Sequence, residues 1–177
     1  AARATLITTA AAVAVCQSLE KLWNLSPGVK WVNDIFLGGK KVCGILTEAA
    51  LGLESGSLEY AVLGIGVNLY PPEGGFPPEL RDIAGSLLEK PAPGARNLLA
   101  AEICNTFSRH YAALEDRLFL EDYRRRSLAL GRRVTVLSAG RATPATALDV
   151  DGECRLLVRF DDGREENLSS GEISICL

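Results

Sequence analysis

The sequence of 177 residues contains no methionine, one histidine and few aromatic side chains. It also lacks an excess of basic residues: the net charge is −3, whereas nucleic-acid-binding domains usually carry a positive surface. We therefore expect this stretch to bind no nucleic acid. Because translated chains begin with methionine and this sequence begins with Ala1, we expect residue 1 to be an internal position of a longer protein.

The cysteines and the apolar residues argue against a zinc-binding protein and against a membrane-spanning segment. The five cysteines form no closely spaced pair, which argues against a zinc site, and their wide spacing suits reduced thiols in the cytoplasm. We expect each of them to be a small buried hydrophobe. The apolar run at residues 5–16 is too short to span a bilayer and lacks the features of a signal peptide.

Apolar periodicity and chain breakers predict the elements of the first part of the chain. Helices are predicted at residues 5–23, 82–89, 95–114 and 120–128. Strands are predicted at residues 29–37, 41–47 and 58–69, and the nearly continuous apolar run of the last indicates burial on both faces. Hairpin turns are predicted at residues 38–39 and 53–57, and a proline-rich loop at residues 71–79.

The pattern changes near residue 131, where short β-type runs begin. They cover residues 132–138, 145–150, 155–160 and 164–168, with turn-forming segments between them. Such spacing is typical of a small β-barrel. We place a boundary near residues 128–131, which gives a first domain at 1–130 and a second at 131–177, each with a core of its own.

Three motifs concern chemistry, and the first is Lys30-Trp31-Val32-Asn33-Asp34. A lysine within an apolar strand is either paired or functional, because an unpaired buried ammonium is costly. The alternative is a lysine on an edge strand whose ammonium reaches water.

The second and third motifs depend on glycine. In the run from Gly64 to Asn68, alternation along a strand puts Gly64, Gly66 and Asn68 on one face. This leaves a shelf without side chains, on which a flat ligand such as a purine can lie, or against which a helix can pack closely. In the run KVCGILTE, Gly44 lies within a strand, which indicates close approach of a ligand or of another backbone.

In this order, KWVND, KVCGILTE and GIGVN resemble the motifs K-W-P-N-D, K-x-x-G-I-L-x-E and G-x-G-x-N of biotin–protein ligases. The likeness continues through residues 71–87 and 160–175. It implies an α+β fold: part of a class II synthetase-like catalytic domain, with a mixed or antiparallel sheet and packed helices, followed by an SH3-like barrel. Val32 replaces the usual proline, and the glycine- and arginine-rich loop that normally precedes the first helix is absent.

The resemblance implies an enzyme that joins biotin and ATP into biotinyl-5′-AMP with the help of Mg²⁺. The biotin then passes to a lysine of a biotin carboxyl carrier domain. Lys30 matches the lysine that contacts the biotinyl carboxylate and the α-phosphate. Asp34 is a candidate Mg²⁺ ligand, with a turn-forming hydrogen bond as its alternative role. The other residues implied in substrate or nucleotide binding are Trp31, Asn33, Gly44, Ile45, Gly66 and Asn68.

The resemblance leaves other functions open. Since most of the biotin pocket would lie upstream, we expect the 177 residues alone to be inactive as a ligase. A biotin-responsive repressor with a DNA-binding domain elsewhere is an alternative, as is a docking fragment without catalysis. Lipoate ligases share the catalytic fold but match the motifs less well. Family members often form homodimers, and we expect structural roles for His110 and for a solvated face at residues 124–126.

Overall fold

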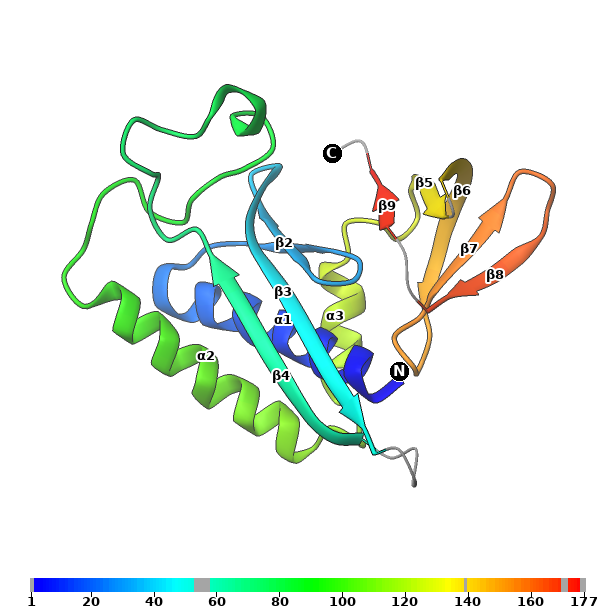
Figure 1. The fold of residues 1–177 in the computed structure, drawn as a ribbon, viewed down its shortest axis with the longest axis horizontal. Coiled ribbons are helices and arrows are strands. Elements are labelled where there is room, and N and C mark those ends of the chain that lie inside the picture. The colour runs from blue at the N-terminus through cyan, green and yellow to red at the C-terminus, as the bar shows by residue number, and fades with distance from the viewer. Residues whose placement is uncertain (1, 53–57, 139, 170–171, 176–177) are drawn as a thin grey trace.

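The computed structural model describes residues 2–52, 58–138, 140–169 and 172–175 (Figure 1). The chain forms two antiparallel sheets, one with strand order β1-β2-β3-β4 and one with order β8-β7-β6-β5-β9. Helices pack against the first sheet, so the predicted α+β class with a small β domain at the end is confirmed. The predicted turn at residues 53–57 lies outside the described residues.

The elements that surround the first sheet occupy residues up to Arg126. They are α1 (Ala2–Trp23), β1 (Gly28–Lys30), β2 (Asp34–Leu37), β3 (Lys40–Leu51), β4 (Leu58–Val67), a 3-10 helix (Pro78–Leu80), α2 (Ala95–Ala112) and α3 (Leu120–Arg126). The second sheet consists of β5 (Arg133–Ser138), β6 (Arg141–Val150), β7 (Leu156–Phe160), β8 (Glu165–Leu168) and β9 (Glu172–Ser174).

Helix α1 forms the centre of the core. Its residues 10–16 are all fully buried, as predicted from a run that is apolar on nearly every side. Alanine side chains let neighbouring elements approach closely, and α1 contacts β3, α2 and α3. The helix therefore supports the first sheet from one side only.

The strand predicted at residues 29–37 is wrong in one respect, because it is two strands. A turn at residues 31–33 folds β2 back on β1, so that Lys30 lies opposite Asp34. Apolar and β-branched side chains made the run resemble one continuous strand. The turn depends on partners distant in the sequence, since Asn33 bonds to Ile45 and Trp31 to Cys154.

The prediction that β4 is buried on both faces is also wrong. β4 is the edge strand of its sheet among the described residues, and only the face toward the helices is partly covered. On the other face Tyr60 is 60% exposed and Val62 is 56% exposed. An apolar run does not distinguish a buried strand from one whose outer face has no cover within the chain.

The helix predicted at residues 82–89 does not form. The amide of Lys41 donates to the carbonyl of Ile83 (2.7 Å), and the amide of Gly85 donates to the carbonyl of Lys41 (2.9 Å). Farther along, the amide of Leu87 donates to the carbonyl of Asn68 (2.9 Å). The segment lies along β3 and the end of β4, so its backbone groups are unavailable for a helical ladder.

The second sheet follows the predicted pattern closely. Each of the four predicted runs contains a strand, and β9 adds a short strand that pairs with β5. Val134, Val136, Leu156 and Val158 alternate with more exposed residues and are buried. The alternation of inward apolar and outward polar residues is the pattern that a strand with one core face requires.

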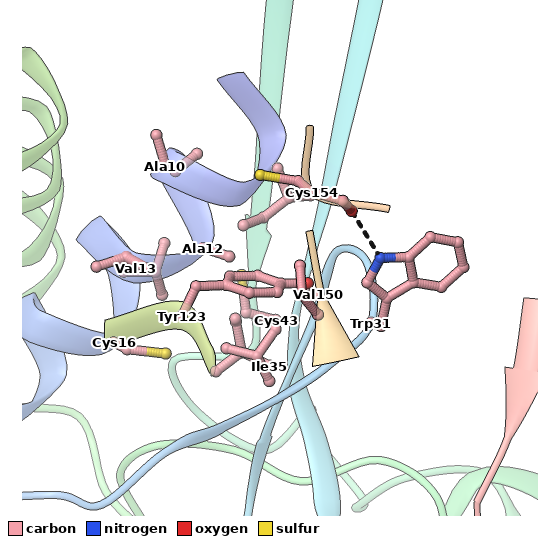
Figure 2. Close-up of a cluster of buried hydrophobic side chains, with 14 of the residues drawn as sticks. Ala10, Ala12, Val13, Cys16, Trp31, Ile35, Cys43, Tyr123, Val150 and Cys154 are labelled. Atoms are coloured by element: carbon pink, nitrogen blue, oxygen red, sulfur yellow. Dashed lines mark hydrogen bonds between the residues drawn. The ribbon is translucent and has the colours of Figure 1, made fainter. Parts of the chain in front are cut away.

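The two sheets nevertheless share one core, so the expectation of separate cores is wrong. A single cluster of buried side chains runs from α1 through the first sheet to β5, β6 and β7. At the junction, the turn after β6 brings Cys154 against α1, where the Thr9 hydroxyl donates to its Sγ (3.1 Å). Figure 2 shows Cys154 and Val150 beside Tyr123 and Trp31 in this cluster. The boundary near residues 128–131 remains a prediction.

The predictions for the structural side chains are confirmed only in part. Cys16, Cys43 and Cys154 are buried as predicted, whereas Cys104 is exposed on α2 and Cys176 lies outside the described residues. The expected solvated face at residues 124–126 holds for Arg125, which is exposed, but is wrong for Arg126, which is buried and forms a bidentate ion pair with Glu20. His110 is half-buried and bonds to Gln17, consistent with a structural role.

Candidate functional site

An open hollow of about 500 Å³ lies on the face of β3 and β4 that α1 does not cover. The predicted site residues Asn33, Asp34, Gly44, Ile45 and Gly66 come together in its lining, with Lys41, Leu46, Gly64 and Ile65. These residues come from the turn after β1, from the start of β2 and from the two long strands, β3 and β4, in the middle of Figure 1. The strands are long enough to hold a ligand of several rings along their axis.

The floor of the hollow is made of glycine. Gly44 pairs with Gly66 across the strands, and Leu46 pairs with Gly64. A methyl group on Gly66 would have Gly44 as its nearest neighbour, with its carbonyl oxygen at 3.7 Å, an ordinary contact. Within the described chain no helix packs on this floor, so the alternative of a close-packed helix is not met.

An ion pair stands at one end of this floor. The Lys41 Nζ lies 2.6 Å from the Asp34 Oδ1, and both side chains are partly exposed. A methyl group on Gly44 would come within 3.3 Å of the Lys41 Cε and 3.4 Å of its Nζ. Glycine at position 44 therefore leaves the room that the Lys41 side chain occupies above the sheet.

Lys41 was not predicted as a site residue because a β-bulge changes the face of β3 on which its side chain lies. Strict alternation would put Lys41 and Gly44 on opposite faces of the strand. In the structure Ile35 pairs with Cys43 and Phe36 with Lys41, so Val42 is an extra residue on β3. The extra residue reverses the alternation and brings Lys41 over Gly44. The signal in the sequence that could have identified Lys41 was its position shortly before Gly44 in the third motif.

Two predicted site residues, Asn33 and Trp31, donate side-chain hydrogen bonds to backbone carbonyls. The side-chain amide of Asn33 donates to the carbonyl of Ile45 (2.6 Å), and the amide of Ile45 donates to the carbonyl of Asn33 (3.0 Å). Trp31 is buried, and its Nε1 donates to the carbonyl of Cys154 (3.0 Å; Figure 2). The indole therefore points into the junction between the sheets and away from the hollow.

Lys30 and Asn68 do not line the hollow as the structure describes it. Lys30 is half-buried and lies directly opposite Asp34 in the β1–β2 hairpin, so its stem leaves the sheet on the same side as Asp34. Asn68 follows β4 and lines an apolar groove of about 760 Å³ between β4 and α2. The predicted shared face of Asn68 with Gly64 and Gly66 ends where the strand ends, at Val67.

Comparison with known proteins agrees with the motifs and the fold. A family model described as the biotin protein ligase C-terminal domain matches residues 129–175. The bifunctional ligase/repressor BirA of Bacillus subtilis is 31% identical over 164 residues, which are 89% of this chain and 49% of that protein. The biotin–acetyl-CoA-carboxylase ligase of Mycobacterium tuberculosis is 32% identical over 174 residues, 94% of this chain and 61% of that protein. The chain is therefore similar to biotin protein ligases over nearly its whole length, and its residues 129–175 match their C-terminal domain.

Solved structures of the family have the same fold. The apo biotin protein ligase of Aquifex aeolicus superposes with a TM-score of 0.80 at 22% identity, over 96% of this chain and 74% of that one. Its complex with biotin and ATP gives a TM-score of 0.73 at 20% identity, over 96% and 70% of the two chains. The present chain thus spans about half the length of the Bacillus ligase/repressor, and a larger share of the solved ligases.

The remaining reactive groups near the hollow are a thiol and a carboxylate. Burial and, less strongly, the Asp34 charge raise the pKa of the Cys43 thiol to about 12, while Lys41 lowers it. Cys43 is therefore neutral at physiological pH and does not act as a nucleophile. The described residues contain no cluster of three metal-binding side chains, so Asp34 is a single candidate ligand.

Proposed function

We propose that this chain belongs to an ATP-dependent biotin–protein ligase that forms biotinyl-5′-AMP and transfers biotin to a lysine of a biotin carboxyl carrier domain. The observation that supports this best is the glycine floor with the Lys41–Asp34 pair at its end. It offers a flat surface for a purine beside a cation for a carboxylate and a phosphate. The relatives named as ligases, and the Aquifex complex with biotin and ATP, support the same reaction.

The first step joins two anions. A carboxylate oxygen of biotin attacks the α-phosphorus of ATP, the bond to the β-phosphate oxygen breaks, and pyrophosphate leaves. Negative charge accumulates on the α-phosphate oxygens as the new bond forms, and a fixed cation stabilises it. The Lys41 ammonium suits this role because it already stands over the floor, held there by Asp34. Lys30 remains the cation predicted from the sequence.

The second step needs little more from these residues. The amine of the carrier lysine attacks the acyl carbon of the mixed anhydride, AMP leaves, and the amine loses a proton. Gly44, Ile45 and Gly66 form the nucleotide side of the hollow in this proposal. Asn68 belongs to that side only if its amide turns toward the ligand from the end of β4. The second sheet covers the nucleotide or receives the carrier domain.

Mg²⁺ is part of the proposal. It would supply charge neutralisation of the phosphates, and it is usually held by one or two carboxylates together with phosphate oxygens and water. Asp34 fits this requirement as the single acidic side chain in the lining of the hollow. Asp34 would hold the metal while its Oδ1 remains in contact with the Lys41 ammonium.

A cytoplasmic location and a homodimer complete the proposal. No helix of the described residues is long and apolar enough to cross a membrane.

Repression is a second candidate function because the Bacillus relative is a bifunctional ligase/repressor. The net charge of −3 gives these residues no part in DNA binding, so repression would need another segment.

The test is single-turnover formation of adenylate by the intact gene product that contains this sequence, with saturating biotin and ATP. Lys41→Ala should slow this step by about 10²-fold or more, as expected for the loss of one preorganised charge. Lys30→Ala is predicted from the sequence to do the same, and Lys30→Arg to rescue it poorly. Lys40→Ala is the matched control, since Lys40 is exposed and its Nζ donates to the carbonyl of Arg81.

The outcomes separate the two assignments. A normal rate for Lys41→Ala with a slow Lys30→Ala would mean that the sequence prediction is right and the geometric one is wrong. No adenylate from the unsubstituted protein would refute the ligase and leave a docking role. The 177 residues alone should catalyse little or no biotin-dependent exchange of pyrophosphate into ATP.

A further inference from the structure

The turn that leads into the site, residues 31–33, is held by three elements, two of which lie outside its own sheet. Each of its three residues has a specific hydrogen bond to a different element. Trp31 bonds to the turn after β6, Val32 to α3, and Asn33 to β3. The next residue is Asp34, which pairs with Lys41. The position of this ion pair therefore depends on how the turn is fixed.

The contact to the second sheet is made by a stiff segment. Cys154 has a left-handed backbone (φ 60°), its amide donates to the carbonyl of Asp151, and it is fully buried. The Asp151 Oδ1 accepts the amides of Glu153 and Arg155, both at 2.9 Å. A backbone so fully bonded presents the Cys154 carbonyl to the Trp31 indole at a fixed place, as Figure 2 shows.

The contact to α3 is equally well defined. The Tyr123 hydroxyl donates to the carbonyl of Val32 at 3.0 Å, and the ring is fully buried beside α1 (Figure 2). Burial raises the pKa of Tyr123 well above its ordinary value, so the hydroxyl keeps its proton across the physiological range. Val32 is half-buried, and without the Tyr123 donor its carbonyl loses the hydrogen bond that ties the turn to α3.

We infer that Trp31 and Tyr123 are positioning residues that hold the turn at residues 31–33 from the second sheet and from α3, and so set Asp34 and Lys41 over the glycine floor. The inference rests on the proposed function for its catalytic consequence. Its structural part concerns the coupling of the turn to β3, which the Ile45 amide reports because that amide donates to the carbonyl of Asn33. In this arrangement the second sheet contributes to the site through Cys154, without lining the hollow.

The first measurement is amide hydrogen exchange, read as the ratio of the Ile45 rate to that of Leu19, a fully buried residue of α1. Trp31→Phe and Tyr123→Phe each remove one donor and keep a ring. Each should raise the ratio by about tenfold, the factor that the loss of one buried hydrogen bond gives. Thr9→Val is the matched control: it removes the other hydrogen bond to Cys154 without touching the turn, and should leave the ratio unchanged.

The second measurement is the kinetics of adenylate formation by the intact gene product. Trp31→Phe and Tyr123→Phe should lower kcat by about tenfold and change the KM for biotin by less than about twofold, because a misplaced ion pair affects the reacting centre. Equal acceleration of exchange at Ile45 and Leu19 would reduce both residues to ordinary packing and overturn the inference. So would a raised ratio with normal kcat in an active enzyme. If the unsubstituted protein forms no adenylate, a raised ratio still supports the coupling, and only the ligase proposal fails.

Discussion

The two sheets of this molecule use their apolar residues in different ways. In the second sheet, Leu156 and Val158 are fully buried, and none of the exposed large apolar side chains of the described residues lies on its strands. In the first sheet, Leu46 is 61% exposed and Tyr60 is 60% exposed, on the face that also carries the glycine floor. The first sheet thus leaves apolar surface uncovered at the place where the ion pair stands.

This difference separates residues kept for folding from residues kept for binding. Buried alternating side chains stabilise a sheet and need no other explanation. An exposed apolar face beside glycines and a positioned cation lowers stability in water and is useful only if something covers it. Under the proposed function, biotin and the nucleotide cover part of this face during the reaction.

Removal of the second sheet should have the largest effect. Deletion of residues 131–177 would expose the α1 and Trp31 surfaces that now contact Cys154 and Val150, so we expect loss of cooperative unfolding. Thermal unfolding followed by circular dichroism measures this. Arg159→Ala, which removes an exposed ion pair with Glu165, is the control and should unfold normally. A sharp transition for residues 1–130 would restore the idea of separate cores.

Truncation of one leucine in each sheet compares them directly. Leu156→Ala should lower the free energy of unfolding by about 2–5 kcal/mol, because it leaves a cavity in a closed core. Leu46→Ala should change it by no more than about 0.5 kcal/mol, since the side chain is exposed. Denaturant unfolding gives both values. Equal costs would mean that the outer face of the first sheet is covered in solution.

Filling the glycine floor should affect binding more than folding. Gly66→Val meets only a carbonyl oxygen at an ordinary distance, so the fold should tolerate it, while the added methyl groups occupy the place of the purine. We expect the KM for ATP to rise by about tenfold with little change for biotin, measured by steady-state adenylate formation. Gly152→Ala, at an open turn position, is the control. A similar loss of affinity for both ligands would indicate a packing role for Gly66.

The smallest expected effect concerns acid. Partial burial raises the pKa of Asp122, but hydrogen bonds from Arg126, Arg125 and Gln17 outweigh it and hold that pKa below its usual value. The stabilisation is therefore present above the ordinary carboxyl range near pH 4, and is lost as pH falls through the lower folded value. Asp122→Asn should remove about 1 kcal/mol of this pH-dependent stability, seen in unfolding between about pH 2 and 5.

The exposed pair of Arg133 with Asp161 in the second sheet gives the control for this acid effect. Arg133 also lowers the pKa of the Asp161 carboxyl, yet both groups face solvent. Asp161→Asn should therefore change the loss of stability at acid pH, the acid limb of the stability curve, very little. If both variants shift the acid limb equally, burial at the α1–α3 junction has no special role. If neither does, the hydrogen bonds of Asp122 contribute nothing to acid stability.

The features that depend on neighbours along the chain could be predicted from the amino-acid sequence alone. The alanine-rich α1, the short strands after residue 131 and the glycine turn at Gly38–Gly39 follow from periodicity and backbone freedom, and all three are present. The ordered motifs likewise predicted the resemblance to biotin–protein ligases. They also predicted that Gly44 and Gly66 lie on one surface, because side chains alternate within each strand segment.

The features that depend on distant partners could be found only from the folded chain. The extra residue Val42 lies in the pairing of β3 with β2, and it moves Lys41 to the side of Gly44. The segment at residues 82–89 is irregular because its backbone groups form hydrogen bonds with β3 and with the residues that follow β4. Trp31 turns away from the site because Cys154, far along the chain, offers it a carbonyl. Each of these choices is made by a hydrogen bond or a pairing between segments whose proximity no local pattern specifies.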